Sequence, residues 1–446
     1  MELREVDEVG RVTSVYVSSK SPDASSGRVD LIGQPNEAPL GQRLLSVFLP
    51  SGYPLTVSPD YAPYQIYDSL QAFASSIAGL LASRAVLQSI GVGDENASAT
   101  AALILRVLQE SVGRLATILF AHYGGRSIEA ECKMYRLAAD IFNDIAMVLD
   151  CLSPSFPESI RVPLFCASSV FRTLCGVAGG SSKASLSSHF AQADNIGELN
   201  AKDSSQETVI SLLGMWAGSL VVANVTTPLA TWLWLLSLLT VHLCTNYAAV
   251  ASVHLRTLNR QRANVAFSHL MADDRVLGPD EVARQEFIFE TDGVLRWKAG
   301  EVIGRCQIGV SLAQFMQRLG GKQSPRTQSF SGLSVPLEDL LAVFARHEYV
   351  LWFDRPAQTA CILLKEGATT QSQLRAWSHA LRTAHHLASS SAGHEAGGAT
   401  GLLQVLDGTL REHDRVFDDY VGRLEKRGWN TVTGALETRA GRRVRM

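Results

Sequence analysis

From residue 208 to residue 255 the chain carries no Asp, Glu, Lys or Arg, although these four residue types make up 19% of the sequence. A run of about 20 mainly apolar residues is enough to cross the roughly 30 Å hydrocarbon core of a bilayer. The most apolar window, residues 228–250, has two Trp near its start, Tyr247 near its end and three Arg soon after it, as expected of interfacial anchors with a positive flank. We therefore predict a transmembrane segment at residues 228–250, with membrane lipid as a partner. The alternative is a buried hairpin of a large soluble helical protein.

A second apolar stretch, residues 209–223, precedes this window and carries Gly214 and Gly218. Small residues four apart allow the backbones of two helices to approach closely. The spacing predicts a helix contact through these glycines, with a second copy of the chain among the partners. The stretch is short for a second crossing, so the number of spanning helices stays open.

Bulk composition excludes several classes of protein. The net charge of −3 gives no global basic character that would indicate nucleic acid. The seven Cys form no Cys-x-x-Cys pair, so neither a zinc site nor a thioredoxin-like motif is indicated. Cys residues in apolar stretches and an acidic first ten residues favour an intracellular membrane over secretion. The tail after Gly422 is basic and is expected to be solvated or to touch anionic lipid.

The chain divides by composition into residues 1–44, 45–275 and 276–446. The first part is polar, with one candidate edge strand at residues 11–17. The second predicts helices punctuated by Gly and Pro, at residues 67–90, 97–122, 128–152, 162–178, 181–193, 202–223 and 228–258. The third predicts a small α+β domain, with strands at 286–290, 306–310, 349–354 and 359–365, helices at 336–346, 370–388 and 409–427, and loops at 320–332 and 389–401. The expected fold class is a mainly α-helical bundle of the membrane type followed by this α+β domain.

The third predicted helix carries its polar residues on one side. At 100° per residue these residues fall within about 120° of the circumference; they are Lys133, Arg136, Asp140, Asn143 and Asp144. The other side is apolar, so we expect the polar stripe to face the interior of a helix bundle. A buried carboxylate needs a partner, and Arg136 can reach Asp140 four residues later. An interhelical salt-bridge network is the simpler interpretation, and a catalytic pair of carboxylates is the alternative.

Residues 189–207 form the densest run of reactive side chains, between two apolar stretches. A Ser–Lys or Ser–His nucleophile pair is conceivable there, so a hydrolase or transferase remains an alternative function. However, no Gly-x-Ser-x-Gly, His-Glu-x-x-His or phosphate-binding loop motif accompanies the run. A solvated loop followed by a helix cap at Asp203 or Ser204, with Glu207 completing a capping box, explains the same residues. His242, within the apolar run, is interpreted as a hydrogen-bonded packing residue, although a His in a membrane span is also a functional candidate.

Several short motifs, taken together, resemble the root UVB sensitive family, which is also described as a domain of unknown function. The resemblance begins at Phe-Leu-Pro-Ser-Gly-Tyr-Pro (residues 48–54) and continues through residues 58–71. It returns around residues 136–144, is strongest at Ala-Lys-Asp-Ser-Ser-Gln-Glu-Thr (201–208) and ends near residue 272. Tyr67 and Tyr135 stand where the family usually has Trp, and Lys183 stands where Arg is common.

The resemblance implies a eukaryotic, membrane-associated protein linked to ultraviolet-B tolerance and vitamin B6 homeostasis, with no established reaction. We therefore predict a non-enzymatic protein with a binding, trafficking or transport role, and another family member as a further partner. A pyridoxal phosphate ligand would need a cationic pocket with an aromatic stacker, for which Lys183, Arg136, Lys202 and Tyr135 are the candidates. The resemblance and the polar patterns together give these binding candidates: Asp60, Tyr64, Gln65, Asp68, Arg136, Asp140, Asn143, Asp144, Lys183, His189, Lys202, Ser205, Gln206 and Glu207.

Overall fold

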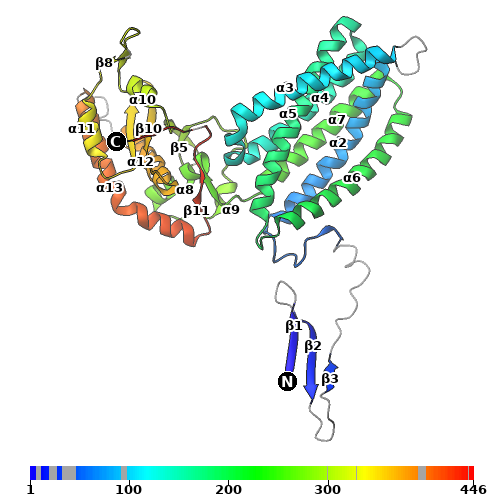
Figure 1. Cartoon of the computed structure of the whole chain (residues 1–446), viewed down its shortest axis with the longest axis horizontal. Helices are drawn as coiled ribbons and strands as arrows, with labels where there is room; N and C mark the ends of the chain where they lie inside the picture. The colour runs from blue at the N-terminus through cyan, green and yellow to red at the C-terminus, as the bar shows by residue number, and fades with distance from the viewer. Residues whose placement is uncertain are drawn as a thin grey trace. The chain divides into compact units, whose positions relative to one another are not determined.

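The computed structural model describes residues 1–6, 12–19, 28–32, 47–91, 98–298, 300–327, 329–389, 398–439 and 441–445. The chain forms two compact units (Figure 1). The first contains residues 1–114 and 137–253, and we call its helical part the helical unit. The second contains residues 115–136 and 254–446, and we call it the C-terminal unit.

The N-terminal strands form a three-stranded antiparallel sheet of their own. Its order is β1 (Glu2–Val6), β2 (Val12–Ser19) and β3 (Arg28–Leu31). The strand predicted from the alternating pattern is confirmed from residue 12 onward, and residue 11 lies outside the described residues. Its expected place at an edge is wrong, because β2 pairs with β1 on one side and β3 on the other.

Six long helices follow: α2 (Tyr61–Ser89), α3 (Ala99–Ala130), α4 (Cys132–Leu152), α5 (Glu158–Phe190), α6 (Ile196–Asn224) and α7 (Pro228–Ser252). The short helix η1 (Ser153–Ser155) separates α4 from α5. Within the described residues, α2, α5, α6 and α7 are long and apolar enough to cross a membrane by length and composition. The predicted segment at 228–250 is therefore one of four candidates.

Helix α2 lies alongside both α6 and α7 (Figure 1). Close packing with α6 depends on Gly214 and Gly218, whose added Cβ atoms would come within 2.7 Å of Ser76 Cβ and of Leu80 Cδ1. In the single chain the Gly-x-x-x-Gly face thus packs against α2, and self-association through it stays a prediction. At the other end, Arg84 donates to the carbonyl oxygens of Val222 (3.0 Å) and Val225 (2.6 Å), where the carbonyls at the end of α6 need donors.

Several predicted helix ends are wrong. Helix α3 continues through residues 124–125 and α5 through residues 179–180, so the two short helices predicted at 162–193 are one. A glycine ends a helix when it adopts positive φ, and the glycines of these two pairs do not. Helix α6 begins at Ile196, so Asp203 and Ser204 lie inside the helix and do not cap it.

The C-terminal unit is built on a five-stranded sheet: β5 (Val294–Trp297), β6 (Glu301–Ile308), β9 (Tyr349–Asp354), β10 (Thr359–Lys365) and β12 (Arg443–Val444). Strand β10 pairs antiparallel with β9 on one side and parallel with β6 and β12 on the other. Two small pairs complete the strands: β4 (Thr257–Asn259) with β11 (Asn430–Ala435), and β7 (Lys322–Gln323) with β8 (Phe330–Ser331). The helices are α8 (Arg260–Asp273), α9 (Pro279–Ala283), α10 (Leu312–Arg318), α11 (Leu337–Val343), α12 (Thr370–Ser389) and α13 (Gly398–Lys426).

The predicted strands 349–354 and 359–365 are confirmed, because their continuous apolar runs are buried on both faces between helices. The predicted strand 286–290 is wrong, since the side chain of Glu286 is buried in an ion pair and the segment joins no ladder. The predicted loop 320–332 contains β7 and β8. Of the predicted loop 389–401, residues 390–397 lie outside the described residues, and residues 398–401 begin α13.

Candidate functional site

Most of the predicted binding residues meet where α2 begins, α5 ends and α6 begins. Asp60 precedes α2 and accepts a hydrogen bond from Ser58 Oγ (2.5 Å), while His189 Nε2, in the last turn of α5, lies 2.9 Å from its other oxygen. The side chains of His189 and Asp60 are only 8% and 3% exposed. Tyr64 is buried beside them, with its ring 5.1 Å from that of Phe190. This contact fixes the beginning of α2 against the end of α5.

A second polar group crosses the same three helices. Gln65 Nε2 of α2 donates to Asp203 Oδ1 of α6 (2.9 Å), and Lys183 Nζ of α5 lies 2.6 Å from Asp203 Oδ2. The same ammonium group lies 2.9 Å from Glu207 Oε2. Asp203 is buried, so its carboxylate is satisfied from both sides, as a buried charge requires. Asp203 itself was predicted only as a helix cap.

Other predicted residues hold the segment that precedes α2. Gln206 Nε2 donates to Phe48 O (2.7 Å) and Lys202 Nζ to Val47 O (3.1 Å). Beside them is an open groove of about 690 Å³. Its wall is mainly apolar and carries a few polar groups, which is the composition typical of small-molecule sites. The groove is lined by Phe48, Leu49, Tyr61, Ala62, Gln65, Ile66, Ser69, Leu70, Phe73, Gln206, Val209 and Ile210.

The nucleophile pairs that the enzyme alternative requires do not form between Ser205 and either Lys202 or His189. Ser205 Oγ donates to the carbonyl of Ala201 within its own helix (2.9 Å), as serines inside helices commonly do. Lys202 and His189 have the other partners described above. The geometry therefore gives the enzyme alternative no activated hydroxyl in this segment.

The polar stripe on α4 points to a second group, inside the helical unit. His242 of α7 brings its Nδ1 to 2.8 Å from Asp144 Oδ1, and its Nε2 to 4.0 Å from Asp140 Oδ1. Among the described residues, neither Asp144 oxygen has a hydrogen-bond partner apart from this contact with His242. Asn246, one turn further along α7, is fully buried with both amide atoms likewise unpaired. We call Asp144, His242 and Asn246 the interior cluster.

The polar residues of the α4 stripe have partners in different places. Asn143 Nδ2 donates to Ser75 Oγ of α2 (3.3 Å). Asp68 of α2, another predicted residue, accepts a hydrogen bond from Gln71 Nε2 (3.1 Å). Lys133 pairs with Glu286 (2.6 Å) in the C-terminal unit, to which the part of α4 up to Arg136 belongs.

The four residues proposed for pyridoxal phosphate are not brought into one pocket of either unit. Lys183 and Lys202 belong to the helical unit, whereas Tyr135 and Arg136 belong to the C-terminal unit. The Tyr135 hydroxyl bonds to that of Ser127 (2.6 Å). For metals, no group of three or more His, Cys, Asp or Glu side chains within the described residues could hold an ion.

Sequence reasoning placed Asp144 among the candidates and read His242 as a packing residue. The spacing of His242 and Asn246, four apart in a charge-free helix, puts both on one face and could have indicated this polar cluster from the sequence.

The family model described as Vitamin B6 photo-protection and homoeostasis domain matches residues 34–274, more than half of the chain. The chain belongs to the root UVB sensitive family. The family model described as Root UVB sensitive protein, C-terminal, also matches residues 309–441, so the resemblance noted in the sequence extends into the C-terminal unit.

The chain is similar to several named members of the root UVB sensitive family. It is 39% identical to RUS family member 1 of Dictyostelium discoideum over 249 residues, covering 55% of this chain and 47% of the relative. It is also 39% identical to protein root UVB sensitive 3 of Arabidopsis thaliana over 247 residues, covering 55% and 56%. The chain thus spans about half the length of these two relatives. Protein root UVB sensitive 2, chloroplastic, of Arabidopsis thaliana is 22% identical over 429 residues, covering 94% and 90%. No solved structure matches the chain.

Proposed function

We propose that this family member is a non-enzymatic protein of an intracellular membrane whose helical unit binds or carries a small molecule in the service of vitamin B6 homoeostasis. The observation that carries the proposal is the interior cluster. Asp144, His242 and Asn246 are each less than a tenth exposed. His242 and Asn246 lie on α7, one of the four helices that are apolar and long enough to cross a membrane, and Asp144 faces them from α4.

A cluster of this kind is costly in a purely structural role. Both amide atoms of Asn246 are buried without a hydrogen-bond partner among the described residues, and burying an unpaired amide in an apolar environment costs several kcal/mol. For this reason ionisable side chains inside membrane helices usually mark a pathway for an ion, proton or substrate. Asp203, by contrast, is fully satisfied by Gln65 and Lys183. The difference between the two groups favours a ligand or proton function for the interior cluster and a packing function for Asp203.

Two further observations support a small ligand. A separate apolar groove of about 690 Å³, lined by Gln65 and Gln206 and not by the interior cluster, is also large enough for a molecule of vitamin size. The name of the matching family model connects this domain with vitamin B6. One relative is named chloroplastic, which supports an organelle membrane as the location.

The membrane part of the proposal is tested by carbonate extraction of membranes from cells that express the full chain, followed by protease protection of the C-terminal unit. We expect the protein to stay in the pellet. Release into the supernatant would mean that the four apolar helices are a buried core, and would overturn the membrane assignment.

The ligand part is tested by binding of pyridoxine, pyridoxal and pyridoxamine to the full chain in lipid nanodiscs. We expect Asp144→Asn to weaken binding of the vitamer by about tenfold or more, because it removes a charge that the ligand would meet. Asp150→Asn is the matched control, since Asp150 lies on the same helix and pairs with Arg172 away from His242. Equal binding by wild type and Asp144→Asn, or no binding of any vitamer, would contradict the proposal.

A further inference from the structure

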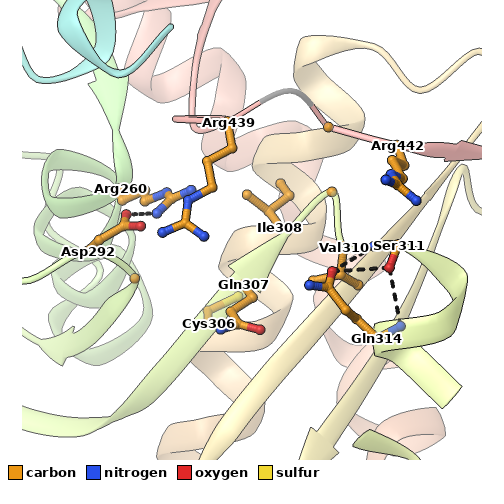
Figure 2. A pocket seen from close by; sticks show the side chains of 13 residues that line it. Arg260, Asp292, Cys306, Gln307, Ile308, Val310, Ser311, Gln314, Arg439 and Arg442 are labelled. Atoms are coloured by element: carbon orange, nitrogen blue, oxygen red, sulfur yellow. Dashed lines mark hydrogen bonds and ion pairs between the residues drawn. The ribbon is translucent and has the colours of Figure 1, made fainter. Parts of the chain in front are cut away.

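The C-terminal unit has a cavity of about 320 Å³ at the end of β6 (Figure 2). Four segments distant in the sequence form it: the first residue of α8, the turn that precedes β5, the stretch from the end of β6 into α10, and the chain beyond β11. Its lining residues are Arg260, Asp292, Gly293, Cys306, Gln307, Ile308, Gly309, Val310, Ser311, Gln314, Arg439, Gly441 and Arg442. We call this cavity the arginine lobe.

The backbone at this place is closely packed. Gly309 has φ of +70°, and a Cβ there would lie 2.6 Å from Glu437 Oε1. Arg442 N donates to Gly309 O (3.1 Å), which ties the C-terminal segment to the turn after β6. Arg439 and Arg442 are thereby placed at the two sides of the cavity. Figure 2 shows Arg439 extending toward Arg260 and Asp292, with Arg442 at the opposite end near Ser311 and Gln314.

A second cavity of about 280 Å³ adjoins the first and shares Arg260, Asp292, Gly293 and Arg439 with it. We call it the hydroxyl lobe, because Ser127, Tyr135 and Thr438 line it. Thr438 is 7% exposed and its Oγ1 has no hydrogen-bond partner among the described residues. A buried hydroxyl without a partner is uncommon in proteins, and this one lines a cavity.

The charges around the arginine lobe do not balance. Asp292 pairs with Arg260, and Glu437, which lies behind Gly309, is held by both terminal nitrogens of Arg443 at 2.9 and 2.7 Å. In the hydroxyl lobe, Glu290 pairs with Arg296 (2.5 Å) and Glu131 accepts a hydrogen bond from Asn259 (2.8 Å).

Each nearby acid therefore already has a partner. Within the described residues, neither Arg439 nor Arg442 forms an ion pair. Arg260 is 8% exposed, and its burial lowers its pKa, an effect that Arg439 adds to. Because Arg260 already pairs with Asp292, an anion between these arginines would compensate the charges of Arg439 and Arg442.

We propose that the two lobes bind a small phosphorylated molecule, with its phosphate between Arg260, Arg439 and Arg442 and its uncharged part in the hydroxyl lobe. Guanidinium groups bind phosphate through paired, charge-assisted hydrogen bonds. Thr438 and the Ser127–Tyr135 pair offer hydroxyl groups to a polar ring or sugar. The combined volume suits a molecule of one ring and one phosphate.

This site is separate from the interior cluster and does not depend on it. Only the choice of pyridoxal 5′-phosphate as the first probe rests on the proposed function. Binding to the full chain in nanodiscs is measured by calorimetry for pyridoxal 5′-phosphate, glucose 6-phosphate, pyridoxal and inorganic phosphate. We expect at least one phosphate ester to bind, and its unphosphorylated form to bind at least tenfold more weakly.

The variants Arg439→Gln and Arg442→Gln should each weaken binding of the phosphate ester by about tenfold. Both side chains are exposed, so neither substitution removes a core contact. Arg415→Gln is the matched control, an exposed arginine on α13 outside both lobes, and should bind as wild type does. Asp144→Asn should also bind as wild type does, which separates this site from the proposed vitamer site.

Three outcomes would overturn the inference: no binding of any phosphate ester, equal losses in Arg415→Gln and the two lobe variants, or binding only of vesicles that contain phosphatidic acid. The last outcome would make the arginines a lipid-headgroup contact. Binding of glucose 6-phosphate without pyridoxal 5′-phosphate would support the site while removing its link to vitamin B6.

Discussion

Lys133 Nζ lies 2.6 Å from Glu286 Oε2, although the two residues are 153 positions apart. Arg262 Nη1 lies 2.7 Å from the other Glu286 oxygen. The three side chains are at most 5% exposed. Burial alone would raise the pKa of Glu286, but Arg262 and Lys133 hold it below its usual range. The triad therefore joins the start of α4 to the segment after α9 as an ionised network within the C-terminal unit.

Replacing Glu286 by Gln should destabilise the C-terminal unit by about 3–5 kcal/mol, since two buried cations would lose their carboxylate. Hydrogen exchange of peptides from α8 in the full chain measures this loss locally. Glu366→Gln is the control, because Glu366 pairs with Arg445 at the surface (side-chain exposure 55% and 83%), where such pairs contribute about 0–1 kcal/mol. Similar protection of α8 in Glu286→Gln and wild type would show that the triad does not stabilise the fold.

The triad also shows why the sequence could not predict all of the site. Helical periodicity placed Asp140 and Asp144 of α4 on one side, and both are buried, but Lys133 of the same stripe pairs in the C-terminal unit. Periodicity reports only neighbours along one helix. Lys133 finds its partner far away in the sequence, and so does Asp144, whose neighbour His242 lies on α7. The elements themselves were predictable where the pattern was strong, as in β9 and β10.

The basic tail after Gly422 likewise has contacts that the sequence alone did not predict. Composition indicated solvated positive charge, yet Arg423, Arg443 and Arg445 each pair with an acid that only the fold brings near. Arg439 and Arg442 are the two that line the arginine lobe. The tertiary structure decides which arginines of a basic run form ion pairs. The spacing of residues in the sequence does not reveal it.

Replacing Gly218 by Val should destabilise the helical unit by about 1–3 kcal/mol, the usual cost of overpacking. A Cβ at this position would lie 2.7 Å from Leu80 Cδ1 and 3.1 Å from the Ile77 backbone. Gly180→Ala is the control in α5, where an added Cβ meets nothing within 4 Å. That change should stabilise the helix by about 0.5–1 kcal/mol. Thermal unfolding in detergent compares the two, and equal effects would mean that α6 does not need this close approach to α2.

Low pH should destabilise the C-terminal unit because of two buried histidines, His379 and His413. Tyr349 Oη lies 3.1 Å from His379 Nδ1, and Thr409 Oγ1 lies 3.0 Å from its Nε2. Burial lowers the pKa of His379 to about 3 and that of His413 well below its usual value. A histidine with a depressed folded pKa stabilises the fold fully above its unfolded pKa, about 6.5. This contribution is lost as the pH falls toward the folded pKa.

Between pH 7.5 and pH 5, His379 alone should therefore cost about 2 kcal/mol. Hydrogen exchange of peptides from β9 and α12, corrected for intrinsic rates, measures the change in the full chain. His379→Gln should reduce the pH dependence, whereas His386→Gln, an exposed position on the same helix, should leave it unchanged. Protection that stays constant over this pH range would contradict the neutral state of the buried histidines.

Glu131 should lower the stability of the C-terminal unit as the pH rises, whereas the buried histidines lower it as the pH falls. Burial raises its pKa to about 7, with Arg262 lowering it and Glu286 raising it. A carboxyl group with a raised folded pKa contributes stability that is fully present below its unfolded pKa, about 4.5, and is lost as the pH rises through 7. Glutamine is neutral at every pH, and its side-chain oxygen can still accept the hydrogen bond from Asn259.

The variant Glu131→Gln should therefore gain stability relative to wild type between pH 5 and pH 8, by about 1–2 kcal/mol. This gain in stability is smaller than the full shift of the Glu131 pKa would give, because the Glu131 side chain is partly exposed at the hydroxyl lobe. The difference in unfolding temperature between variant and wild type, measured at both pH values without added ligand, tests the sign. Glu129→Gln, at an exposed position, should show no such trend. If the advantage of Glu131→Gln does not grow as the pH rises, the Glu131 carboxyl is ionised in the folded protein throughout this range.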